Sequence, residues 1–332
     1  MMTSSHAVRK DAVLTSEDGM QSLIEHANAV YDAWEAGTLR HEDALQELDN
    51  VIAEAQEQQL TDALLAGLHK KVILLRDTGA LDLAFQINQQ VFDLAQAQGN
   101  LRYLSYAAFN RGDILRIQGK TEQARQDFRD AYKYADEAQD YLAAAYALHS
   151  EGKIVMALQQ ADQALMLGEK GLAYIQLYLE TTKQPDPIHS SLQSGLNQLL
   201  ARVAMANGDS EVTWKRAQQA LDFAQIRHSS LELGNTYCVL AELATHSEVF
   251  PDGFNNDFDT YYQTALIYYE RAHAEAEMAS AQLMYSQSLF ANGRTEEAIT
   301  LAETAGRSFK KLQRGADFLH ANKLLITYRK PP

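Results

Sequence analysis

An internal repeat of about forty residues is the feature that most restricts the fold of this chain. When residues 101–139 are placed over residues 141–179, a shift of forty, small side chains fall on small ones and apolar side chains on apolar ones. The aligned pairs are Ala108 with Leu148, Gly112 with Gly152, Leu115 with Val155, Ala124 with Ala164, and Ala131 with Gly171. A period of this length is typical of repeat architectures, so single motifs have to be interpreted within it.

Each copy consists of an apolar-periodic segment, a short turn with glycine, and a second apolar-periodic segment. The turn glycines are Gly37, Gly79, Gly119, Gly208 and Gly293, and one copy near residues 231–275 has its turn stretched to residues 245–259. Glycine suits the end of a helix because it adopts the left-handed conformation at little steric cost. An acidic residue after the turn, such as Glu122, suits the positive end of the next helix. The copies are therefore predicted to be helical hairpins, which bury their apolar faces only by stacking on neighbours.

This pattern resembles the tetratricopeptide repeat (TPR) family, and the residues that carry the resemblance are Gly112, Leu115, Ala124, Phe128 and Ala131. The resemblance covers residues 20–328. It departs from the family in its longer period, in the missing closing proline and in Gly168, which stands where an aromatic residue is expected. The longer helices are similar to a variant found in bacterial regulators and peptide sensors. The resemblance implies an all-α fold, a TPR-like α-α superhelix (an α-solenoid) of about seven hairpins with a C-terminal capping helix near residues 316–328.

The domain organisation follows from the same pattern. We expect residues 1–18 to form a flexible N-terminal tail and residues 19–332 to form a single solenoid. The clearest interruption is at residues 181–191, where Pro185 and Pro187 stop the preceding helix. This segment is either a long loop, which we favour, or a soft hinge.

Composition excludes several classes of function. A net charge of −15 argues against nucleic-acid binding, which requires a basic surface. No apolar segment approaches the length that spans a membrane, and the N-terminus lacks the apolar segment of a secretory signal, so we expect a cytoplasmic protein without membrane contact. The single cysteine, Cys238, excludes an internal disulfide and a cysteine-rich zinc site.

The charge is unevenly distributed along the chain. Residues 42–62 carry seven acidic side chains and no basic ones, and residues 307–330 carry seven basic side chains and one acidic one. Such blocks are usually solvated helix faces, but they also leave open contacts with a partner or between copies of the chain in a homo-oligomer.

The sequence motifs that suggest nucleotide binding or catalysis do not meet the requirements of these functions. Gly119-Lys120-Thr121 matches the end of a nucleotide-binding P-loop, but Ile114 occupies the place of the required first glycine, and no strand precedes it. The turn between two helices explains this stretch. No serine-hydrolase or HExxH signature occurs, and Arg111-Gly112-Asp113 is explained by chance and helix packing. We therefore expect no enzymatic activity, no cofactor and no bound metal.

The resemblance implies a binding groove, because in TPR proteins the first helix of each hairpin lines the concave surface. Transferring that frame gives a peptide- or partner-binding set of His69, Arg76, Tyr106, Asn110, Asp113, Arg116, Tyr146, His149, Lys153 and Arg202. A local surplus of basic residues on an acidic protein suits the carboxylates of a peptide. Alternatively, these positions are only solvated or pack against neighbouring helices. The sequence thus predicts a non-enzymatic scaffold for a protein or peptide partner. The alternative is a sensing regulator that passes a change of curvature to an effector.

Overall fold

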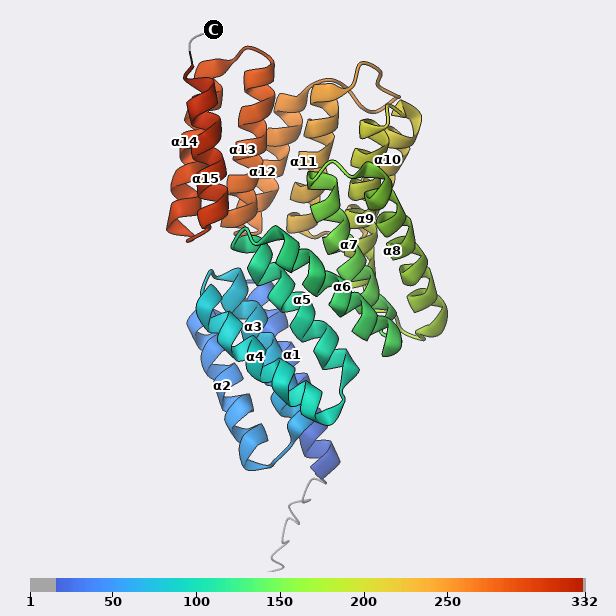
Figure 1. Ribbon diagram of the computed structural model, residues 1–332, viewed down its shortest axis with the longest axis vertical. Coiled ribbons are helices and arrows are strands. Elements are labelled where there is room, and N and C mark those ends of the chain that lie inside the picture. Colours follow the sequence, from blue (N-terminus) through green and yellow to red (C-terminus); the bar gives the residue numbers. More distant parts are fainter. Residues whose placement is uncertain (1–15, 331–332) are drawn as a thin grey trace, which may run out of the picture. The chain divides into compact units, whose positions relative to one another are not determined.

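The computed structural model of the protein describes residues 16–330, and this part of the chain is built of fifteen α-helices without a strand. The helices are α1 (Ser16–Glu35), α2 (His41–Glu57), α3 (Thr61–Asp77), α4 (Leu81–Gln98), α5 (Leu101–Ile117), α6 (Thr121–Glu137), α7 (Tyr141–Ala157), α8 (Ala161–Thr181), α9 (Ile188–Ala206), α10 (Ser210–Arg227), α11 (Ser230–His246), α12 (Phe258–Arg271), α13 (Glu275–Ala291), α14 (Thr295–Lys311) and α15 (Gly315–Tyr328) (Figure 1). The predicted all-α fold of paired helices with a final helix is confirmed. Residues 1–15 of the predicted tail lie outside the described residues, and residues 16–18 belong to α1.

The chain divides into two compact units, residues 1–95 and residues 96–332, with the boundary inside α4. In the first unit, α1, α2 and α3 all contact one another. Leu23 and Val30 of α1, Leu48 and Val51 of α2, and Leu74 of α3 are buried in their shared core. Small residues such as Ala27, Ala44 and Ala63 complete this core, which brings the helix axes close together.

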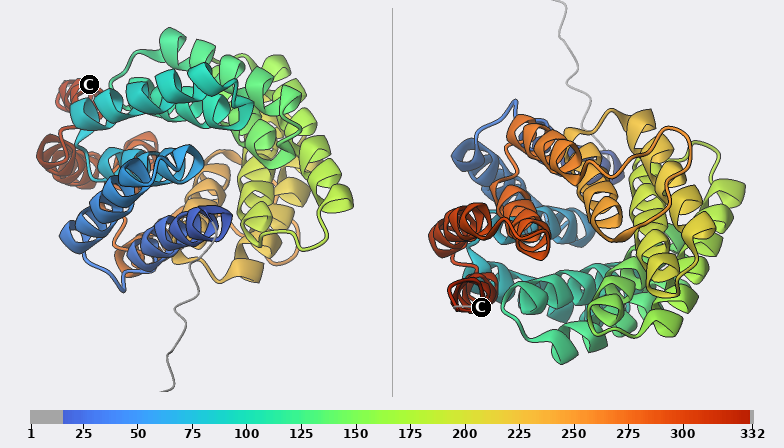
Figure 2. Two further views of the ribbon diagram at one scale, coloured as in Figure 1. Left: turned by 90° about the horizontal axis from the view of Figure 1, so that it is seen from below. Right: turned by 90° about the horizontal axis from the view of Figure 1, so that it is seen from above.

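The second unit is a row of helical hairpins. α5 packs on α6, α7 on α8, α9 on α10, α11 on α12, and α13 on α14, and α15 packs on α14. The first helices also contact each other from hairpin to hairpin, whereas among the described residues α6, α8, α10, α12 and α14 make no such contacts with each other. The first helices are therefore the more closely packed layer, which makes their free side the inner face of a curved row (Figure 2, green to red). We call the side formed by α5, α7, α9, α11 and α13 the inner face.

The turn at Gly119 is a helix C-terminus in the left-handed conformation, with φ +78°. The Gly119 N–H donates to the Arg116 carbonyl at 3.0 Å, and the Lys120 N–H donates to the Leu115 carbonyl at 2.8 Å. The next turn has the same pattern around Gln139, whose φ is +56°. Several turns of the protein are thus made without glycine, at Gln59, Gln139, Gln159, His228, His273 and Gln313.

Glycines inside helices give α9 its place against the α7–α8 hairpin. A Cβ at Gly168 would lie 2.7 Å from Leu200 Cδ2, and one at Gly171 would lie 2.7 Å from Leu196 Cδ2. Gly152 of α7 receives Leu199 in the same way, at 2.6 Å. Gly168 stands where the preceding copy has Phe128, so the departure from the repeat pattern makes room for a leucine of the next hairpin.

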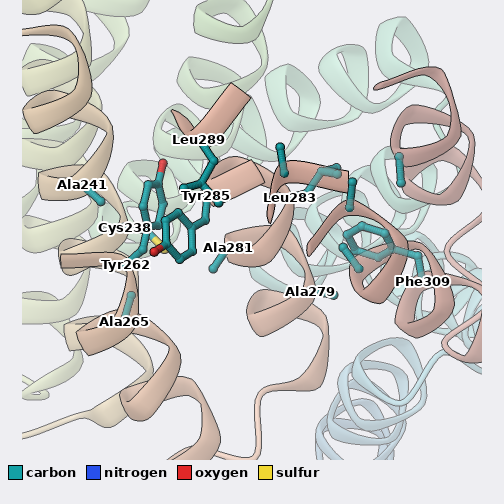
Figure 3. Packing of buried hydrophobic residues seen from close by; sticks show 14 of the residues in the cluster. Cys238, Ala241, Tyr262, Ala265, Ala279, Ala281, Leu283, Tyr285, Leu289 and Phe309 are labelled. Atoms are coloured by element: carbon teal, nitrogen blue, oxygen red, sulfur yellow. The ribbon is translucent and has the colours of Figure 1, made fainter. Parts of the chain in front are cut away.

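The stretched turn between α11 and α12 covers α10. Trp214 of α10 donates from Nε1 to the Val249 carbonyl at 3.0 Å, and Phe254 lies 4.8 Å from its ring centre. Beyond this turn, Tyr262 of α12 stacks on Tyr285 of α13, with ring centres 4.8 Å apart (Figure 3). Cys238 and Ala241 of α11 belong to the same buried cluster.

Candidate functional site

Three cations of the predicted set belong to successive first helices: Arg116 on α5, Lys153 on α7 and Arg202 on α9. Arg116 Nε donates to Asp113 Oδ1 at 3.0 Å, and Arg202 Nε donates to Glu242 Oε2 at 2.6 Å. Lys153 is exposed and has no hydrogen bond or ion pair with any described residue. Of these three cations, Lys153 is therefore the one that has no partner within the described part of the chain.

The surroundings of Lys153 favour an incoming anion. Its pKa is lowered to about 8, first by desolvation and then by the neighbouring Arg116 and Arg202, while Asp113 and Glu277 act in the opposite direction. These neighbours lie on α5, α9 and α13, so Lys153 faces the side that the first helices share. Because the side chain is exposed, solvent moderates these effects. The direction of the pKa shift is downward, because desolvation and the two guanidinium groups disfavour the charged form of the ammonium group.

His149 lies one turn before Lys153 and has a structural setting. Burial lowers its pKa to about 3, and Lys153 lowers it too, so the imidazole is neutral at physiological pH. Its ring rests on Gly195 of α9, where an added Cβ would lie 2.7 Å from the ring atom Cε1. His149 thus fixes how closely α7 and α9 approach.

The aromatic and amide members of the predicted set lie largely beneath the surface. Tyr106 donates from its hydroxyl to Asp140 Oδ2 at 2.9 Å, and its pKa is raised by burial. The exposed fraction of Asn110 is 2%, which leaves its amide under the inner face. Tyr146 is half-buried, with its ring edge-on to Phe109 at 6.3 Å between ring centres. Tyr106 and Tyr146 thus connect α5 with α7 and the residue before it, and a role in ligand binding stays a prediction for all three residues.

His69 and Arg76 belong to α3 in the first unit. Arg76 Nε lies 2.7 Å from Asp77 Oδ1, and the Arg76 side chain is only 14% exposed. Burial lowers the pKa of His69 to about 3, with further effects of Lys70 and Arg76. Binding at these two positions also stays a prediction.

The inner face continues into a pocket that the sequence-based prediction missed. It has a volume of about 120 Å³ and is lined by Glu242 and His246 of α11, Tyr262 of α12, and Met284, Gln287 and Ser288 of α13. The repeat itself carried the signal, because a shift of forty from Arg202 falls on Glu242. The charge that pairs with Arg202 thus occupies the equivalent position one hairpin later.

Residues 16–330 offer little for metal binding, for cysteine chemistry or for crossing a membrane. No cluster of three or more His, Cys, Asp or Glu side chains in this range could hold a metal ion. Burial raises the pKa of the Cys238 thiol to about 12, which makes it a poor nucleophile. None of the described helices is long and apolar enough to cross a membrane. What the inner face offers is a set of fixed charges of both signs, which suits recognition by ion pairs and hydrogen bonds.

Comparisons with known proteins give structural neighbours only. No protein-family model matches the chain, and no curated protein matches it significantly. The chain is similar to a tetratricopeptide repeat protein from Parabacteroides merdae ATCC 43184, with 16% identity, a TM-score of 0.49, and coverage of 93% of this chain and 100% of that one. It is also similar to the TPR-like repeats of a kinesin light chain from Podosopora anserina, with 16% identity, a TM-score of 0.42, and coverage of 64% and 98%. The stacked hairpins of the second unit make the fold a TPR-like α-solenoid.

Proposed function

We propose that the protein is a non-enzymatic scaffold that binds a protein or peptide partner on the inner face of the second unit. The observation that carries this proposal is Lys153, an exposed cation without a partner among the described residues, between the helices of Arg116 and Arg202. A carboxylate of the partner, from an acidic side chain or the C-terminus, neutralises this cation. The bond is charge-assisted, which makes it stronger than a bond between neutral groups.

Arg116 extends the same site. Its Nε is occupied by Asp113, and the guanidinium group has further N–H donors that a second carboxylate oxygen can accept from. The side chain is 37% exposed, so a ligand reaches it without unfolding α5. The overall charge of this chain is negative, yet Lys153 and Arg116 together select an acidic segment of the partner.

A peptide array tests the proposal. The array displays peptides with free C-terminal carboxylates beside their amidated twins, and it is probed with the wild type and with Arg116→Glu/Lys153→Glu. We expect the double reversal to weaken binding of the selected peptides by at least about tenfold, the loss of one or two charge-assisted bonds. Lys215→Glu/Lys310→Glu changes the net charge equally at two exposed positions and serves as the control. Unchanged affinity in the first variant contradicts the proposal.

The second candidate function is a sensor that passes a change of curvature to an effector. It is favoured by the spread of the charges around Lys153, which come from α5, α9 and α13. An anion at Lys153 alters the balance of these charges across several hairpins at once. Small-angle scattering with and without a selected peptide distinguishes the two functions, because a passive scaffold keeps its radius of gyration on binding.

A further inference from the structure

The pocket between α11 and α13 has one charged wall. Glu242 is the only carboxylate among its lining residues. Oxygen Oε2 of Glu242 accepts from Arg202 Nε at 2.6 Å, and Oε1 has no hydrogen-bond partner among the described residues. Half of this carboxylate therefore remains free to accept a further hydrogen bond. Met284 adds an apolar surface, and Gln287 is exposed at the pocket with an amide oxygen.

The opposite wall is held in place by its own contacts. The hydroxyl groups of Tyr262 and Ser288 lie 3.2 Å apart, and Thr245 donates to Ser288 Oγ at 2.9 Å. The Tyr262 ring stacks on Tyr285 with 18° between the ring planes (Figure 3). A wall with these bonds is pre-organised, so little ordering is required when a side chain enters.

Arg202 connects the pocket to Lys153. Its guanidinium contacts Glu242 on the pocket wall, and its positive charge also acts on Lys153 and His149 of α7. Because α7 contacts α9 and α9 contacts α11, a ligand that places a carboxylate at Lys153 continues over Arg202 towards the pocket. Along this path the charge of the inner face changes from positive to negative.

We propose that this pocket receives the side chain of a lysine or arginine of the bound peptide, and that it thereby fixes the direction in which the peptide lies. This inference rests on the proposed function, because the peptide is held at its acidic end by Lys153. The cationic group donates to Glu242 Oε1 and to the Gln287 amide oxygen, and the aliphatic stem packs on Met284. The ligand is a segment with an acidic and a basic group, in which the acid faces α7 and the base faces α11 and α13.

A peptide series tests this inference. The probes are fluorescein-labelled decapeptides of Gly and Ser with a free C-terminal carboxylate, in which one lysine is moved stepwise along the chain. Each has a twin with norleucine, which keeps the aliphatic stem and lacks the charge. We expect one lysine position to bind about tenfold more tightly than its norleucine twin, the effect of one charge-assisted bond. Equal binding of every pair overturns the inference. If no peptide of the series binds the wild type, the proposed function itself fails.

Variants of the Arg202–Glu242 pair give opposite expectations. Arg202→Gln releases both oxygens of Glu242, so the preference for lysine over norleucine should rise. Arg202→Gln/Glu242→Gln has the net charge of the wild type and no charge in the pocket, so the preference should fall to about one. A preference that survives in the double variant overturns the inference. Gln287→Lys, at an exposed position, is a second variant that should abolish the preference if the double variant fails to fold.

Discussion

Arg202 of α9 donates to Glu242 of α11 at 2.6 Å, and these two residues are separated by one period of the repeat. The ion pair therefore joins equivalent positions of neighbouring hairpins across the inner face. It also marks the place where the face changes from cationic, at Arg116 and Lys153, to the acidic pocket of Glu242. At this equivalent position the charge thus changes sign between two neighbouring hairpins.

The pH dependence of binding follows from Lys153, whose pKa is lowered to about 8. The ammonium group is charged below this pH and loses its proton above it, while a peptide carboxylate stays ionised throughout. Affinity for an acidic peptide should therefore be constant from pH 6 to about 7 and fall above about pH 8, by up to about tenfold per unit. Fluorescence anisotropy between pH 6 and 9 measures this. In Lys153→Arg the decline should vanish, and a wild-type affinity that does not change up to pH 9 contradicts the assignment.

The left-handed turns between helices predict that two substitutions change the free energy of unfolding in opposite directions. Gln139 has φ +56° and Gly293 has φ +78°, a conformation that only glycine adopts without cost. Gln139→Gly should raise the free energy of unfolding by about 0.5 to 1 kcal/mol, and Gly293→Ala should lower it by about 1 kcal/mol. Urea denaturation followed by circular dichroism gives both values. Two changes of the same sign would show that the left-handed turns do not control these stabilities.

The packing of Gly168 against Leu200 predicts that substitutions at these two positions are coupled in their effect on the free energy of unfolding. An added methyl group at Gly168 would lie 2.7 Å from Leu200 Cδ2, so Gly168→Ala should destabilise by about 1 kcal/mol after the gain in helix propensity. In a Leu200→Ala background the space is free, and the same substitution should stabilise by about 0.5 to 1 kcal/mol. The four unfolding free energies of this double-mutant cycle test the contact. An identical effect of Gly168→Ala in both backgrounds would show that the two residues do not interact.

Much of the fold could be predicted because small residues recur with the period of the repeat. Ala124 and Ala131 are fully buried, and Gly112 lies so close to Phe128 that a Cβ would be 2.9 Å from its ring. The tripeptide Arg111-Gly112-Asp113 belongs to this packing: Arg111 Nη2 lies 2.6 Å from Asp127 Oδ1, and Asp113 pairs with Arg116. The non-glycine turns could not be predicted, because glutamine in the left-handed conformation has no distinct sequence signal.

The candidate site was harder to predict, because exposure within a helix depends on its neighbours. Lys153 and Asn110 were assigned to the same surface, yet Lys153 is exposed and Asn110 is 2% exposed. The rotation of each helix about its axis decides which of its side chains are exposed. This rotation is set by contacts such as His149 on Gly195, which join residues far apart in the sequence. The pocket at Glu242 was missed because the predicted set ended at Arg202 on α9, although a shift of forty continues it to Glu242 on α11.

The central claim, that a partner carboxylate pairs with Lys153, is tested most directly by a thermodynamic cycle. A selected peptide and its twins, in which each carboxylate is removed in turn by amidation or by Asp→Asn and Glu→Gln, are titrated against the wild type and Lys153→Ala by calorimetry. One twin should bind the wild type at least about fivefold more weakly than the parent peptide does. The same twin should bind Lys153→Ala almost as tightly as the parent peptide does, which is a coupling of about 1 kcal/mol. Additive losses for every carboxylate, with no coupling to Lys153, would contradict the account.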